Sequence, residues 1–176
     1  MALRLGFLTK FKFKDMKKAN ILYSLLSLLL VMTTMSSCKK DQEIGGTAVQ
    51  ELSGEWWVTA DDGGGATDYF KISTYNTAAN IPTEMWIDDA KNFYGLKAKI
   101  KADVANKTFS ATDADELYFG VTVTITDGKV IKDAATASGT GNKTDSIYFK
   151  AEYSDDPGTI YTYSGYKRTR FSQDDH

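Results

Sequence analysis

Tyr94-Gly-Leu-Lys-Ala-Lys-Ile-Lys-Ala-Asp-Val104 is the stretch that decides the fold. From Leu96 onward its even-numbered positions are apolar and its odd-numbered positions are charged. Because successive side chains of a β-strand point to opposite faces, a period of two is typical of a strand with one buried face and one face in water. The stretch therefore predicts a strand that covers a core on one side.

The same alternation returns in Gly120-Val-Thr-Val-Thr-Ile-Thr126, where three β-branched apolar residues share one face. Asp127 and Gly128 follow, and then the run Lys129-Val-Ile-Lys132. Asp-Gly between two such runs favours a two-residue type I′ turn, because both turn residues need positive φ. We therefore expect a β-hairpin that turns at Asp127 and Gly128.

Further strands are expected where short runs of β-branched and aromatic residues stand between turn sequences. They cover residues 55–60, 68–75, 83–88, 107–111, 145–153 and 159–171. Turns such as Asp155-Asp-Pro-Gly158 separate them, since proline presets φ and glycine accepts positive φ. No amphipathic helix competes with these strands. The sequence predicts an all-β fold, a single antiparallel meander of about eight strands that closes into a β-barrel or a sandwich.

The first 37 residues differ in kind from the rest of the chain. Basic residues, among them Lys17 and Lys18, precede an apolar run at 21–32 that ends at small and polar residues. A run of about a dozen apolar residues suits the core of a secretory signal and is short for a membrane-spanning helix. We therefore predict a cleaved signal peptide at 1–37 and a translation start at Met16.

Cys38 is the single cysteine of the chain and directly follows Met35-Ser-Ser37. A single cysteine cannot form a disulfide within the chain. Small residues before a cysteine, at the exit of an apolar segment, resemble the lipobox of bacterial lipoproteins, in which the thiol receives a diacylglyceryl group. The resemblance implies a lipidated Cys38 that anchors the protein to a membrane, followed by a linker that ends at residue 50. It also implies an outer membrane lipoprotein that faces the periplasm or the cell surface.

The charge balance changes once residues 1–37 are set aside. They hold six of the 21 basic side chains and one of the 23 acidic ones, which leaves 15 basic and 22 acidic. The predicted domain at 51–171 has no basic stripe of the kind that binds nucleic acids or anionic lipid surfaces. We therefore expect neither as a partner. The segment 172–176 is expected to be a mobile polar tail.

One face of the predicted strands forms an apolar row that would point into the barrel. An eight-stranded barrel either fills with its own side chains or holds one small ligand. If the row lines a pocket for a small hydrophobic or lipid-like ligand, the candidate binding residues are Phe70, Ile72, Leu96, Ala98, Ile100, Val121, Val123, Phe149 and Tyr163. The assignment depends on strand register, because a slip of one residue would turn the row outward.

Leu52-Ser-Gly-Glu-Trp56 near the start and Gly165-Tyr-Lys-Arg168 near the end resemble the calycin, or lipocalin-like, arrangement. In that arrangement a Gly-x-Trp motif places an indole at the closed end of the barrel, and a basic side chain of the last strand lies over it. The resemblance implies a cation–π contact between Trp56 and Arg168, which would form a structural pair that closes the barrel.

Longer stretches that follow one another in order carry a second resemblance. They are residues 52–58, 69–76, 82–89, 144–149 and 154–158, followed by 164–166. Together they are similar to the lipid-binding putative hydrolase family of Bacteroidetes lipoproteins, over roughly 52–171. The resemblance implies a lipocalin-like fold and a lipid ligand, and it supplies no catalytic motif.

The sequence offers little for catalysis. The single histidine is His176, and a Gly-x-Ser-x-Gly motif is missing, whereas acyl transfer needs a histidine beside its nucleophile. Acid pairs such as Asp61 with Asp62 would serve a glycosidase only if two carboxyls faced each other across a cleft. Asp113-Ala-Asp-Glu116 lacks the ligand order of a calcium loop. We therefore expect no catalytic residues, no metal site and no cofactor.

Three functions stay open from the sequence. The first is noncovalent binding of a small hydrophobic or lipid-like ligand, which co-purified lipid would favour. The second is an interaction module with a filled barrel, whose outer aromatics Trp57, Trp86, Tyr148 and Tyr166 dock an outer-membrane protein or a glycan. The third is a lipid or glycan hydrolase, which measured turnover would favour.

Overall fold

The computed structural model describes Tyr23 and residues 45–176 of the chain. The predictions for the signal peptide and for Cys38 lie outside the described residues. In the part of the chain that is described, none of the helical segments has the length and apolar character needed to cross a bilayer.

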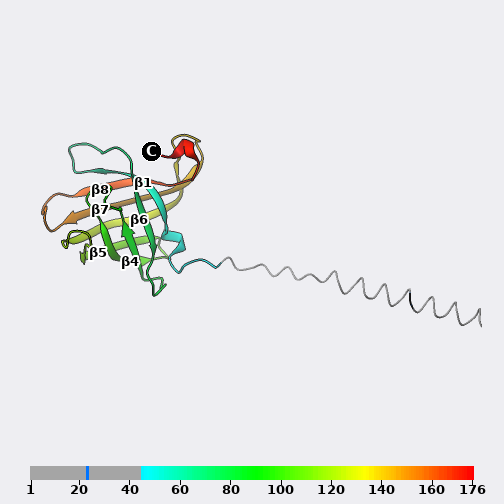
Figure 1. The fold of residues 1–176 in the computed structure, drawn as a ribbon, viewed down its shortest axis with the longest axis horizontal. Helices are drawn as coiled ribbons and strands as arrows, with labels where there is room; N and C mark the ends of the chain where they lie inside the picture. Colours follow the sequence, from blue (N-terminus) through cyan, green and yellow to red (C-terminus); the bar gives the residue numbers. More distant parts are fainter. Residues whose placement is uncertain (1–22, 24–44) are drawn as a thin grey trace, which may run out of the picture. The chain divides into compact units, whose positions relative to one another are not determined.

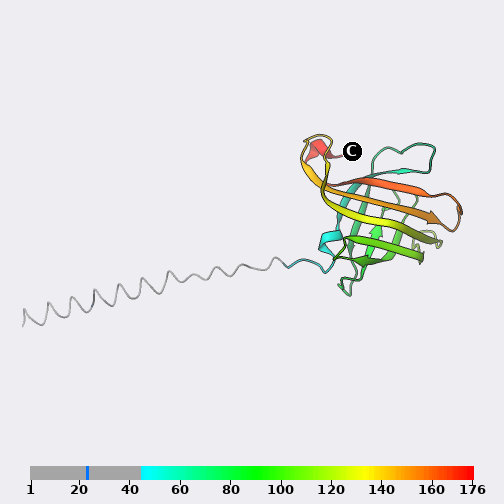
Figure 2. The same cartoon turned by 180° about the vertical axis from the view of Figure 1, so that it is seen from behind.

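Eight strands follow one another around a closed antiparallel barrel, and the last strand pairs with the first. They are β1 (Gly54–Asp61), β2 (Phe70–Asn76), β3 (Glu84–Asp88), β4 (Lys97–Asp103), β5 (Thr108–Asp115), β6 (Thr122–Thr136), β7 (Lys143–Tyr153) and β8 (Tyr161–Lys167). Short 3₁₀ turns, η1 (Gln50–Leu52) and η2 (Ser172–Asp174), flank the barrel in the sequence. Figure 1 and Figure 2 show the strands wrapped around a common interior. The predicted all-β meander is confirmed, in the form of a barrel.

The expected hairpin turn at Asp127 and Gly128 is wrong. β6 runs through both residues without a break and pairs with β5 on one side and β7 on the other. Asp127 does take a positive φ of 57°, but the register of the β6–β7 ladder shifts here, which is the mark of a β-bulge. Because a bulge increases local twist, the Asp-Gly pair bends one long strand around the barrel.

The middle of the barrel is packed with its own side chains. Phe149 stacks on Tyr163 with ring centroids 4.4 Å apart, and the hydroxyls of Tyr163 and Tyr153 lie 2.9 Å apart. Phe109 packs against Phe149, with ring centroids 5.8 Å apart. The buried core also contains Val58, Ile72, Met85, Ile87, Leu96, Ala98, Ile100, Val123, Ile125 and Ile147. Burial of this apolar surface is the main force that stabilises the fold.

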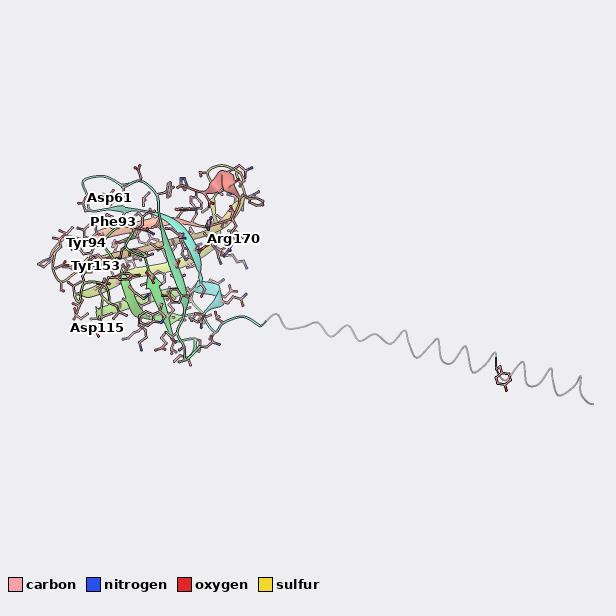
Figure 3. All side chains as sticks on the ribbon, viewed as in Figure 1. Asp61, Phe93, Tyr94, Asp115, Tyr153 and Arg170 are labelled. Atoms are coloured by element: carbon pink, nitrogen blue, oxygen red, sulfur yellow. The ribbon has the colours of Figure 1, made fainter. Side chains whose placement is uncertain are left out.

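The two ends of the barrel are closed by different means. The base end is formed by η1 with loops 77–83, 104–107 and 137–142, and the mouth end by loops 62–69, 89–96, 116–121 and 154–160. At the base, the Thr74 hydroxyl donates to the Leu52 carbonyl (2.6 Å) and accepts from the Trp56 indole (2.9 Å). At the mouth, Phe93, Tyr94 and Tyr153 lie at the same end of the barrel (Figure 3), and Tyr94 stacks on Tyr153.

Candidate functional site

The residues predicted to bind a ligand all belong to one apolar cluster inside the barrel. Ile72, Leu96, Ala98, Ile100, Val123, Phe149 and Tyr163 are buried, whereas Phe70 and Val121 are partly buried and pack against them. These side chains therefore face the interior of the barrel, which is the side expected from the alternation. The row is packed in the middle of the barrel, so access for a ligand depends on the mouth end.

Loop 89–96, called the lid loop below, covers the mouth with two aromatic rings. Phe93 stacks on Phe70 at 5.2 Å between centroids and meets Tyr161 and Tyr163 edge to face. Tyr94 stacks on Tyr153 at 3.8 Å. Phe93 is still 37% exposed, so its ring lies between the core and the solvent. The lid loop thus separates the apolar row from water.

The conformation of the lid loop is set by Asp89 and by left-handed backbone. The buried Asp89 carboxylate accepts from the backbone N–H groups of Lys91 (2.8 Å) and Gly95 (2.9 Å). Ala90, Lys91 and Gly95 have φ values of 53°, 63° and 84°. The turn at Gly95 explains why β4 begins at Lys97 and not at Tyr94 as the alternation predicted. Burial raises the pKa of Asp89 despite these hydrogen bonds.

Two tyrosine hydroxyls tie the rings at the mouth to loop 154–160. Tyr94 donates to Asp155 at 3.0 Å, and Tyr161 donates to Asp156 at 2.8 Å. Desolvation, and after it the hydrogen bond to Asp155, raises the pKa of Tyr94 to about 12. The hydrogen bond to Asp156, and after it desolvation, raises the pKa of Tyr161 to about 12. Both tyrosines are therefore neutral donors at neutral pH. The bond from Tyr94 latches the lid loop to loop 154–160, whereas Tyr161 belongs to β8 and its bond fixes the end of loop 154–160.

The rim of the mouth combines exposed apolar side chains with carboxylates. Leu117, Phe119 and Ile160 are more than half exposed. Ile160 also borders a surface hollow of about 410 Å³, which is lined by Thr59, Asp61, Asp62, Gly63, Ala66, Ile160, Thr162 and Ser164. Among the described residues, the ion pairs found do not involve Asp61, Asp62 or the two carboxylates that accept from the tyrosines. The rim is apolar, and its carboxylates outnumber its lysine, Lys91, whose Nζ lies over the Tyr118 and Phe119 rings.

The predicted cation–π pair between Trp56 and Arg168 is wrong, because the cation near Trp56 is the preceding residue, Lys167. Lys167 pairs with Trp56 in the β1–β8 ladder, and its Nζ lies 5.6 Å from the centre of the buried indole. Arg168 lies instead 5.9 Å from the outer tryptophan, Trp57. Trp56 and Trp57 point to opposite faces of β1, because neighbouring side chains of a strand alternate. Lys167 is on the face of Trp56, and Arg168 is on the face of Trp57.

The four outer aromatics named for a docking surface do not form one surface. Trp57 and Tyr166 lie together under the C-terminal segment, in a small cluster with Ala137. Trp86 lies on β3. Tyr148 lies on β7 beside a surface groove of about 680 Å³ that is also lined by Lys101, Ala102, Asp103, Thr108, Phe109, Ser110, Asp127, Gly128 and Lys129.

Residues 172–176, which were expected to form a mobile polar tail, pack on the outside of the barrel. Asp174 is buried, and His176 stacks on Tyr69 at 4.2 Å between ring centroids. His176 Nε2 lies 3.3 Å from the Ser138 hydroxyl. No carboxylate is hydrogen-bonded to this imidazole among the described contacts, as a catalytic triad would require. Among the described residues, no cluster of three or more His, Cys, Asp or Glu side chains suits a metal ion.

Sequence reasoning did not single out the lid loop residues Asp89, Phe93 and Tyr94. The alternating stretch that begins at Tyr94 predicted a strand there, not a loop. The signal that could have found them is the run Asp89-Ala-Lys-Asn-Phe-Tyr-Gly95, in which two aromatics stand before a glycine and therefore in a turn.

A closed meander of eight antiparallel strands with an aromatic lid over one end defines a lipocalin-like β-barrel protein. The family model described as lipid-binding putative hydrolase matches residues 41–172, and the chain belongs to this family. No curated protein matches the chain significantly. Membership of the family and the closed barrel together identify a lipid-binding type of barrel protein.

Proposed function

We propose that the protein binds one small hydrophobic or lipid-like molecule, without covalent chemistry, at the mouth of the barrel. The observation that carries this proposal is the lid loop, which places Phe93 between the solvent and the apolar row. A ligand that takes the place of the Phe93 ring would contact Phe70, Tyr161 and Tyr163. Burial of apolar ligand surface at these rings would contribute about 25 cal/mol per Å².

The charge of the rim suggests which polar group the ligand carries. The carboxylates of Asp155 and Asp156 stand beside Tyr94 and Tyr161, and Asp61 and Asp62 line the neighbouring hollow. Like charges repel, so a fatty-acid anion would meet an unfavourable potential here. Amphiphiles with an uncharged or cationic head should therefore bind more tightly than fatty acids of equal chain length at neutral pH.

Native mass spectrometry of the chain with Cys38→Ser, purified gently from a lipid-containing host, tests the binding. We expect a stoichiometric adduct that organic solvent extracts. Phe70→Glu, which puts a carboxylate among the mouth aromatics, should abolish the adduct, whereas Ile131→Glu on the exposed face of β6 should retain it. A clean mass with no uptake of amphiphiles would contradict the proposal.

We further propose that Cys38 is lipidated and becomes the first residue on removal of residues 1–37, and that the protein is an outer membrane lipoprotein facing the periplasm or the cell surface. The lipobox-like Met35-Ser-Ser-Cys38 behind an apolar run supports this. Two or more acyl chains would hold the domain stably at the membrane. In a detergent phase-partition assay the native chain should enter the detergent phase, and Cys38→Ala should not. Membrane association of Cys38→Ala after signal cleavage would contradict the anchor.

A docking role is a second candidate because the 680 Å³ groove beside Tyr148 lies outside the barrel and is unrelated to the mouth. Lys129 stands over the Tyr148 ring at 5.1 Å. An aromatic face next to lysines suits a glycan or a protein partner of the outer membrane. A Tyr148→Ala variant that lost a specific glycan or partner while keeping lipid uptake would support this role.

A further inference from the structure

The C-terminal segment occupies a groove on the outside of the barrel, separate from the mouth. The groove, called the tail groove below, is formed by Trp57, Tyr69, Ser138, Thr140, Tyr166 and Arg168. Asp174, Asp175 and His176 each contact a different part of it. The barrel is already closed by the β1–β8 ladder, so this segment is not needed to complete the sheet.

Asp174 is recognised as a carboxylate. It is buried, and its Oδ1 accepts from the backbone N–H groups of Gly139 (2.9 Å) and Thr140 (2.6 Å). Its Oδ2 accepts from the hydroxyls of Thr140 (2.7 Å) and Thr169. Four donors around one side chain favour the ionised acid, because hydrogen bonds to a charged acceptor are about twice as strong as those to a neutral one.

Asp175 is recognised by a fixed arginine. Arg168 Nε and Nη2 donate to the two carboxylate oxygens of Asp175 at 2.6 Å each. Glu55 holds the same guanidinium from its other side, with Nη1 at 3.2 Å from Glu55 Oε2. A planar guanidinium that is held in place binds a carboxylate through two parallel hydrogen bonds, with a geometry that lysine cannot offer.

His176 is held as a planar ring. Its imidazole lies on Tyr69 at 4.2 Å with an angle of 22° between the rings, and it meets Trp57 edge to face at 5.5 Å. Its Nε2 is hydrogen-bonded to the Tyr166 hydroxyl and lies 3.3 Å from that of Ser138. The imidazole is therefore stacked on one ring, meets Trp57 and Tyr166 edge to face, and has two hydroxyl groups near Nε2.

The connection to the barrel allows the segment to leave the groove. Arg170 lies between β8 and the C-terminal segment and has a left-handed φ of 68°. Its side chain is 77% exposed, and the next residue, Phe171, is 53% exposed. Besides its hydrogen bonds and the ion pair with Arg168, the segment covers Trp57 and Tyr166, so a partner segment that replaced it would have to cover the same rings. The tail groove is thus a recognition surface whose present occupant can be exchanged.

We propose that the tail groove is a peptide-binding site for a partner protein that presents two acidic residues followed by a planar ring, and that Asp174–His176 fill it as an intramolecular competitor. The charge and hydrogen-bond complementarity seen with the chain's own segment defines the partner. Peptide binding here would be an activity additional to the proposed ligand binding at the mouth.

The test uses the full chain with Asp174→Ala, Asp175→Ala and His176→Ala, and the synthetic peptide Phe-Ser-Gln-Asp-Asp-His as the probe. Binding is measured by isothermal titration calorimetry, and the fold of the variant is checked by its NMR spectrum. We expect the peptide to bind the variant, and to bind the native chain much more weakly, because the tethered segment competes at an effective concentration in the millimolar range. A peptide with both aspartates replaced by asparagine should bind about tenfold more weakly or worse.

Arg168→Leu in the same variant should remove peptide binding, whereas Lys99→Leu, which removes a surface cation on β4 that pairs with Glu84, should leave it unchanged. If the peptide does not bind a folded variant, the proposal is overturned. It is also overturned if the peptide binds equally well when its aspartates are replaced by asparagine and when Arg168 is replaced by leucine. If the triple variant does not fold, Asp175→Ala alone replaces it. Peptide binding to that variant that is tighter than to the native chain is then the supporting result, and equal binding overturns the proposal.

Discussion

Gly165 is the residue at which β8 tolerates the least added volume. A Cβ atom there would lie 2.0 Å from the Trp57 carbonyl oxygen and 2.7 Å from Val58 Cα. Because these are backbone atoms of the paired strand, a side-chain rotation cannot relieve the overlap. The β1–β8 ladder therefore requires glycine at this position.

Gly165→Ala should lower the free energy of unfolding by about 1–3 kcal/mol, in the range of overpacked sites. Urea denaturation followed by tryptophan fluorescence measures this. Gly45→Ala is the control, since a Cβ atom there has no neighbour within 4 Å. Equal stability of both variants would show that the strands shift without cost.

The contacts of Asp174 should depend on pH in a defined window. Burial by itself would raise the pKa of Asp174, but the hydrogen bonds from Thr169, Thr140 and Gly139 outweigh it and lower the pKa from 3.8 to about 2. Since the folded value is the lower one, the stabilising contribution is fully present above about pH 4 and is lost as the pH falls through 2. Amide exchange at Gly139 and Thr140 should become faster in this window. Asp174→Asn should show no such change, and an identical pH profile in that variant would contradict the assignment.

Single residues also show where sequence reasoning stops. Gly54-Glu-Trp56 was enough to place a buried indole at the base of the barrel. It did not identify the cation, because Lys167 and Arg168 are adjacent in sequence and only the register of β1 with β8 decides which of them faces Trp56.

The lid loop is the element on which the proposed function depends. Tyr94 fastens it to loop 154–160 through one hydrogen bond to Asp155. Removal of that bond by Tyr94→Phe should cost the closed lid about 1 kcal/mol, which corresponds to about a fivefold larger open population. The ring stacking on Tyr153 is kept in this variant, so the hydrogen bond alone is tested.

Stopped-flow uptake of a fluorescent neutral amphiphile should therefore be about fivefold faster for Tyr94→Phe than for the native chain. Tyr75→Phe is a matched control, because its hydroxyl donates to Asp88 at the same distance of 3.0 Å but lies on β2, outside the lid loop. Unchanged uptake by Tyr94→Phe would mean that the lid loop does not limit access.

β6 illustrates at the scale of an element why a correct local signal can give a wrong structure. Asp127 and Gly128 form the strongest hairpin sequence in the chain, and Asp127 does adopt positive φ. The same backbone geometry also suits a bulge, and pairing of one continuous strand with both β5 and β7 satisfies more hydrogen bonds than a turn would.

The molecule as a whole is held together by closure, because the β1–β8 ladder removes both free sheet edges. Thr59→Pro takes away a backbone donor in the middle of that ladder, where Thr59 faces Ser164. Proline inside a paired strand removes a ladder hydrogen bond and leaves its acceptor unpaired, which should cost about 1–3 kcal/mol. Thermal unfolding should show a large loss of stability, whereas Thr59→Val, which keeps the backbone donor, should stay close to the native chain. A small effect of proline would mean that closure contributes little.

The sequence by itself determined the all-β class, the order of strands along most of the meander and the inward apolar row, because alternation along a strand is a local property. Only the tertiary structure decided that the barrel is packed in its middle, that the lid loop covers its mouth, that Lys167 and not Arg168 meets Trp56, and that Asp174–His176 lie in a groove. Each of these depends on contacts between residues far apart in the chain, and such contacts follow from strand register and closure, which no local pattern encodes.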